Sequence, residues 1–179
     1  MSIDVIVKAA NIDVSMFNRE QLDYFLSCDE LPFCIELKCS MQNLTKLPKL
    51  PQCCRLDCHR NQLQQLPPLL KCIELKCSYN QLTDLPELPN CVTLLCDNNH
   101  LEWLPDLPHC QKIQCYNNLL KTIDDLPECT HINCSSNQLN RLEGIPQCRH
   151  LSCGFNYLEV GPKLIFLSNQ FSDTESLNV

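Results

Sequence analysis

The sequence predicts an α/β solenoid, in which successive turns of the chain each add one short strand to a parallel β-sheet. Cysteine recurs every 19 residues in two columns, which run from Cys34 to Cys148 and from Cys39 to Cys153. A leucine or isoleucine column and an asparagine column keep the same period, and prolines fall between one strand and the next. Repetition at a fixed period near 20 residues is the signature of a stacked repeat architecture.

Seven consecutive units read C-x-x-L-x-C-x-x-N-x-L-x-x-L-P-x-L-P-x. This pattern resembles the leucine-rich repeat, L-x-x-L-x-L-x-x-N/C-x-L, with cysteine at two of the leucine positions. The L-P-x-L-P segment, as in Leu85 to Pro89, is similar to the short-repeat subclass of secreted bacterial effectors. Similar cysteine-bearing arrays occur among proteins of large amoeba-infecting viruses. The resemblance covers residues 31–166 and implies an interaction module whose partner differs from member to member.

Each L-x-C triplet has the alternation of a β-strand, because residues two apart point to the same face. Leu37 and Cys39 therefore face inward, whereas Glu36 and Lys38 face outward. Stacking the triplets places a parallel sheet on the concave face. Proline forbids a regular helix in the return segments, so we expect an extended or polyproline-like convex side. No turn buries its apolar face alone; each needs its neighbours.

The two ends of the chain depart from the repeat. We expect a short strand over residues 3–9 and a helix from Ser15 to Ser27, with Ser15 as its N-cap. The predicted division is an N-terminal cap over 1–30, seven 19-residue repeats over 31–166 and a polar C-terminal tail over 167–179. The last repeat has no full successor, and an uncovered edge strand favours association. We therefore expect residues 162–179 to cover this edge, or a weak homodimer to form through it.

The composition bears on which partners and which compartment to expect. A formal net charge of −7 and a pI near 5.1 disfavour nucleic acid and anionic membranes as partners. No apolar run reaches the length that spans a bilayer, and the first residues lack the pattern of a signal peptide. We expect a cytoplasmic protein, either in its own cell or in the cytoplasm of a host cell.

Sixteen cysteines raise the question of metals and disulfides. Structural zinc sites use closely spaced pairs such as C-x-x-C, whereas each unit here gives C-x4-C. Disulfides between neighbouring turns cannot pair all the cysteines of a column, because each column has seven members. We expect the columns to be small buried hydrophobes, without metal or cofactor. Two alternatives to an interaction module stay open: a thiol- or metal-binding protein, and a structural assembly component that associates through its C-terminal edge. No nucleophile triad, phosphate loop or paired-carboxylate motif indicates an enzyme.

The outward face of the sheet is the predicted binding surface. In the first three turns its charges alternate in sign, as in Glu36, Arg55 and Glu74, and satisfy one another. Later turns carry aromatic, apolar and histidine side chains that favour contact with a partner protein. The candidate partner-binding residues are Tyr79, Leu95, Tyr116, His131, His150 and Phe155. The asparagine column, in contrast, is expected to hydrogen-bond backbone groups at the bend after each strand.

Overall fold

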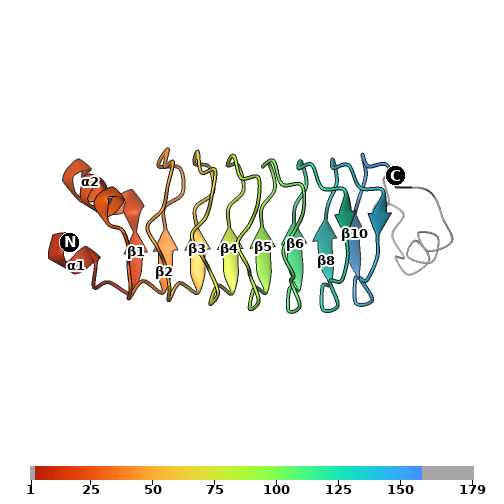
Figure 1. Ribbon diagram of the computed structural model, residues 1–179, viewed down its shortest axis with the longest axis horizontal. Coiled ribbons are helices and arrows are strands. Elements are labelled where there is room, and N and C mark those ends of the chain that lie inside the picture. Colours follow the sequence, from red (N-terminus) through yellow and green to blue (C-terminus); the bar gives the residue numbers. More distant parts are fainter. Residues whose placement is uncertain (1–2, 159–179) are drawn as a thin grey trace.

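A computed structural model describes residues 3–158 of the 179-residue chain. Its main feature is an eight-stranded parallel sheet in the order β1-β2-β3-β4-β5-β6-β8-β10 (Figure 1). The strands are β1 (Asn11–Asp13), β2 (Glu36–Lys38), β3 (Arg55–Asp57), β4 (Glu74–Lys76), β5 (Thr93–Leu95), β6 (Lys112–Gln114), β8 (His131–Asn133) and β10 (His150–Ser152). From β2 onward each strand pairs with its copy 19 residues away, as in Leu37 with Leu56. The predicted solenoid fold is confirmed.

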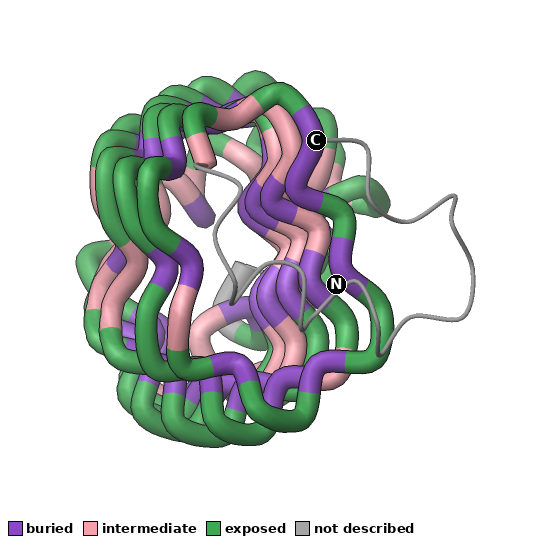
Figure 2. The backbone as a smooth tube through the Cα atoms, turned by 90° about the vertical axis from the view of Figure 1, so that its right-hand side faces the viewer, coloured by how far each residue is buried: buried purple, intermediate pink, exposed green. Residues whose placement is uncertain are grey.

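The core is a stack of equivalent side chains. The central leucine or isoleucine of each repeat strand is buried, and Leu75 and Cys77 of one turn are both fully inaccessible. Seen along the stack, buried positions recur at the same places in successive turns (Figure 2). A single turn has one layer of such side chains, so its apolar surface is covered only by the turns before and after it.

The two cysteine columns have different roles in this core. All fourteen of their thiols are buried and free. In the first column each Sγ donates to the carbonyl oxygen two residues later, as Cys91 does to Thr93 at 3.3 Å. In the second column, which includes Cys96, no such hydrogen bond occurs within residues 3–158. Both columns are the expected buried hydrophobes. The thiols of the first column also hydrogen-bond the first residue of each repeat strand.

The asparagine column links neighbouring turns, as expected. Asn80 Oδ1 accepts the N–H of Leu63, 17 residues earlier, at 3.0 Å. Its Nδ2 donates to the carbonyl oxygens of Cys58 in the previous turn and Cys77 in its own, both at 3.0 Å. The equivalent bonds are made by Asn61, Asn99, Asn118, Asn137 and Asn156. Each asparagine thus satisfies backbone groups that the sheet leaves unpaired.

The N-terminal end corrects two expectations. Residues Ile3–Ile6 form a short helix, α1, and the strand of this region is β1 instead. Its central Ile12 pairs with Leu37 and is buried, like the central residue of the other strands of the sheet. After a 3₁₀ turn, η1 (Val14–Met16), helix α2 (Arg19–Ser27) begins at Asn18 rather than Ser15, because Asn18 and Gln21 form a reciprocal capping box.

The return segments on the back of the sheet carry no helix between Pro32 and Leu158. In the last two described turns, the first proline of the L-P-x-L-P pattern is replaced by Asp124 and Glu143. There the chain forms two short parallel strands, β7 (Thr122–Ile123) and β9 (Arg141–Leu142), which were not predicted. The repeat end at 166, the tail over 167–179 and the covering role of 162–179 lie outside the described residues.

Candidate interaction surface

The outward face over β2–β4 is a lattice of ion pairs. The guanidinium of Arg55 lies 3.9 Å from a carboxylate oxygen of both Glu36 and Glu74. Each glutamate also pairs with the lysine two residues later: Lys38 Nζ at 3.1 Å and Lys76 Nζ at 2.9 Å. These side chains are partly exposed, so each pair is worth only about 0–1 kcal/mol. The early turns therefore present charges that already have partners.

Next to this lattice, a buried carboxylate organises the ends of β4–β6. Asp97 is only 4% exposed and accepts hydrogen bonds from Ser78 Oγ at 2.6 Å and Asn98 Nδ2 at 2.8 Å. Ser78, Asp97 and Tyr116 occupy the same position in three consecutive turns, which brings them side by side. We call Tyr79, Leu95, Asp97 and Tyr116 the tyrosine cluster.

The hydroxyl group of Tyr116 lies near the Asp97 carboxylate. Burial, then the negative charge of Asp97 and a hydrogen bond to it, then the neighbouring Tyr79, raise the pKa of Tyr116 to about 12. The hydroxyl is therefore protonated at neutral pH and is available as a donor to the carboxylate. The ring is half-buried, which fixes it more firmly than a freely exposed aromatic side chain.

Tyr79 is the exposed member of the cluster. Its side chain is 46% exposed, and the guanidinium carbon of Arg60 lies 5.2 Å from the ring centroid, a cation–π contact. Its backbone is left-handed, with a φ of 56°. The same conformation recurs at the equivalent position of every repeat, in Met41, Arg60, Tyr79, Asn98, Asn117, Ser136 and Phe155. The third residue after each repeat strand is therefore exposed or half-buried.

A shallow depression of about 410 Å³ lies beside the cluster. Tyr79, Leu95 and Asp97 line it together with Arg60 and Gln114. Most of its lining side chains are polar or charged, and Tyr79 and Leu95 supply apolar surface among them. Aromatic residues and arginine are enriched in protein interfaces.

His131 and His150 form a second, separate feature over β8 and β10. Their rings stack with centroids 4.4 Å apart and planes 22° from parallel. Desolvation, followed by the positive charges of His150, Lys112 and Arg149, lowers the pKa of His131. Together with Lys112 the pair lines a smaller depression of about 220 Å³. The later turns of this face therefore present a stacked imidazole pair with Lys112 as the one lysine or arginine of the depression, in contrast to the mixed charges of the first turns.

The six predicted site residues thus fall into three places. Tyr79, Leu95 and Tyr116 come together, His131 and His150 form the stacked pair, and Phe155, 83% exposed, lines neither depression. The sequence reasoning missed Asp97 and Arg60, which organise the tyrosine cluster. Aligning the position after the second cysteine of each repeat would have revealed the Ser-Asp-Tyr column.

Within residues 3–158, no group of three or more His, Cys, Asp or Glu side chains is placed to hold a metal ion. Burial raises the pKa of Cys58, Cys77 and Cys96 well above the usual thiol value, which leaves little reactive thiolate. Neither helix of this part of the chain has the length and apolar content needed to cross a membrane.

Among solved structures, the chain is similar to YopM, a leucine-rich effector protein from Yersinia pestis. The two share 32% sequence identity and a TM-score of 0.71 over 88% of this chain. The match takes in 45% of the YopM chain, so this chain spans less than half of its neighbour's length. No family model and no curated protein matches the sequence. The architecture is that of a leucine-rich-repeat solenoid, a fold that serves typically as a non-enzymatic interaction scaffold.

Proposed function

We propose that this chain is a non-enzymatic module that binds a partner protein through the outward face of its sheet. The observation that carries the proposal is the tyrosine cluster, where an exposed aromatic ring and a half-buried leucine lie beside a depression at the end of the ion-pair lattice. Aromatic side chains fixed in place are the typical anchors of protein interfaces. The stacked pair His131 and His150 with Lys112 forms a second part of the same surface.

The likeness to a leucine-rich effector supports a finer proposal, that the chain acts on a protein of a host cell, in the host cytoplasm. The L-P-x-L-P repeat type and the resemblance to viral arrays point the same way. Contact through the tyrosine cluster does not require the later edge of the sheet, so the weak homodimer predicted at that edge is compatible with partner binding.

The test compares variants of the full chain in affinity purification from host-cell extract, followed by binding measurements with the protein recovered. Tyr79→Ala removes an exposed anchor without touching the core and should weaken binding by about 1–3 kcal/mol. Glu36→Ala and Lys38→Ala alter the ion-pair lattice and should change binding little.

Tyr116→Phe separates the ring from the hydroxyl of that residue: binding should survive if the ring is the anchor. If the lattice variants abolish binding while Tyr79→Ala does not, the partner sits over β2 and β3 and the proposal is wrong.

A further inference from the structure

The back of the solenoid contains a discontinuity between two neighbouring return segments, residues 103–108 and 122–127. The earlier segment keeps Pro105, whose ring fixes φ near −65°. The later segment has Asp124 at that position, forms β7, and then turns left-handed at Asp125, with a φ of 53°. Asp106, the equivalent of Asp125, has no positive φ. The two segments therefore cannot follow the same path.

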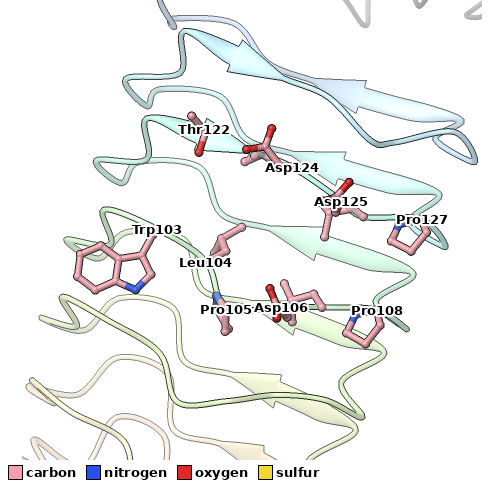
Figure 3. Close-up of a pocket in the computed structure, with 12 residues that line it drawn as sticks. Trp103, Leu104, Pro105, Asp106, Pro108, Thr122, Asp124, Asp125 and Pro127 are labelled. Carbon is pink, nitrogen blue, oxygen red and sulfur yellow. The ribbon is translucent and has the colours of Figure 1, made fainter.

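A groove of about 550 Å³ lies between them (Figure 3). This volume is in the range of pockets that hold ligands. Figure 3 shows Trp103 at one end of the groove, with Pro108 and Pro127 at the other. Leu107, Ile123 and Leu126 lie beneath the groove in the core, each 2% exposed, so its accessible apolar surface comes from Trp103, the half-buried Leu104 and Pro105, and the two prolines at its end. We call this cavity the back groove.

One wall of the back groove is the unpaired edge of β7. The carbonyl oxygen of Ile123 accepts the N–H of Glu143 at 3.1 Å, so Ile123 directs its backbone groups toward β9. Because backbone groups alternate along a strand, those of Thr122 point the opposite way, toward residues 103–108. Nothing among the described residues bonds them there: no backbone hydrogen bond links 103–108 with 122–127. A strand edge of this kind is a template for an added strand.

The rim of the groove is acidic. Asp106 lies on one wall, and Asp124 and Asp125 on the other (Figure 3). Arg141 pairs with Asp124, with Nη2 at 2.7 Å from Oδ2, whereas Asp106 is in no ion pair among residues 3–158. No lysine or arginine lines the groove. The Trp103 side chain is 56% exposed and offers its ring face, which attracts a cation.

We propose that the back groove binds a short, extended, basic segment of a partner protein, which adds as a strand along β7. The segment's backbone pairs with Thr122, its apolar side chains face Leu104 and Pro105, and its lysine or arginine side chains contact Trp103 and Asp106. This site lies on the opposite side of the coil from the tyrosine cluster and is independent of the function proposed for that face.

The test uses the full chain and a fluorescently labelled synthetic peptide of alternating arginine and valine, with a glutamate–valine peptide as control. Binding is measured by polarisation, and the emission of Trp103, the only tryptophan of the chain, reports occupancy of the groove. We expect the basic peptide to bind, to shift this emission and to weaken as salt rises. Equal binding of the acidic peptide would overturn the proposal.

Matched variants locate the site. Asp106→Lys reverses a charge on the rim and should weaken binding at least tenfold. Glu87→Lys makes the same change at the equivalent position one turn earlier, outside the groove, and should change binding less than twofold. Tyr79→Ala should leave peptide binding unchanged, which separates this site from the sheet face. Equal losses for Asp106→Lys and Glu87→Lys would show a diffuse attraction to the acidic back and refute the groove.

Two further peptides test strand addition itself. N-methylation of every second amide removes the donors along one edge of an extended peptide, so the odd and even patterns block opposite edges. One pattern should abolish binding and the other should retain it. If both bind as well as the parent peptide, the segment does not pair with β7.

Discussion

Asn99 Nδ2 donates a 3.1 Å hydrogen bond to the carbonyl oxygen of Cys77, 22 residues earlier and one turn back. Its Oδ1 accepts the N–H of Leu82 at 3.0 Å, so one buried amide joins two turns by both of its ends. The equivalent asparagines make the neighbouring turns interdependent in the same way.

Asn99→Asp should therefore destabilise the protein strongly. A carboxylate keeps the acceptor for Leu82 but loses both donors and turns a negative charge toward two carbonyl oxygens. We expect a loss of about 3 kcal/mol or more in the free energy of unfolding, measured by denaturant titration. Asn140→Asp, at an exposed position, is the control and should cost little. A similar loss of stability in both variants would mean that the hydrogen bonds of the asparagine column contribute little to the stability of the fold.

The two cysteine columns should respond differently to serine. Cys91→Ser places a hydroxyl where the thiol already donates to Thr93, so its partner is retained. Cys96→Ser buries a hydroxyl where the thiol has no such partner, and should cost about 1–3 kcal/mol. Denaturant unfolding of the two variants gives the comparison. Equal destabilisation would show that the hydrogen bond of the first column has no energetic role.

Thiol reagents should distinguish the columns from the two remaining cysteines. Cys28 and Cys54 are half-buried, whereas the column thiols are buried. In native protein we expect rapid modification of Cys54 or Cys28 and slow modification of the rest, with all 16 reacting after denaturation. Mass spectrometry of partly labelled protein identifies the sites. Early labelling of column cysteines such as Cys77 would contradict their place in the core.

His131 should titrate below the ordinary histidine pKa of about 6.5. Desolvation and the positive charges of His150, Lys112 and Arg149 disfavour its protonation in the folded state. The folded protein therefore binds this proton less readily than the unfolded chain, and its stability falls as the pH drops below about 6.5. The effect is small because the ring is exposed. NMR titration should show that the pKa of His131 rises in the His150→Gln variant. An unchanged pKa would mean that the charge of His150 does not contribute to the lowered pKa of His131.

Gly144 should not tolerate a side chain. Its φ is +66°, and a Cβ atom would lie 2.6 Å from the backbone nitrogen of Asp125. Gly144→Ala should destabilise the protein by about 1–3 kcal/mol and disturb the pairing of β7 with β9. Thermal unfolding checks the first effect and hydrogen exchange at Glu143 the second. Unchanged stability would mean that this loop relaxes freely.

The front of the solenoid follows from the sequence because its period carries the information. Once Leu37 and Cys39 are placed inward, the 19-residue period fixes the register of every later strand. The period also places each asparagine at the bend after a strand, where it can hydrogen-bond backbone groups. The N-terminal end has no such repetition. The apolar residues of Ile3–Ile6 and the single Ile12 are equally compatible with a short strand in the sequence. Only pairing with β2 decides that the strand is at Asn11–Asp13.

The surface details depend on contacts between turns rather than within them. The buried position of Asp97 results from Ser78 in the turn before it and Tyr116 in the turn after it. The back groove results from a difference between two return segments, and its only sequence signal is the loss of proline at Asp124. A consensus repeat sequence hides such differences between turns. The features particular to this protein therefore lie at positions where the repeats differ from one another.

The asparagine column also makes the order in which the turns are synthesised matter for folding. The N–H of Leu63 is capped by Asn80, 17 residues further along the chain, and the same holds for the equivalent leucines from Leu44 to Leu139. A turn emerging from the ribosome is therefore left with an open bend until its successor has been synthesised and has folded. Removing a turn from the N-terminal side leaves these caps intact, whereas removing one from the C-terminal side uncaps the turn before it. Assembly and fraying of the coil are thus unequal at its two ends, and the newest turn is always the incomplete one.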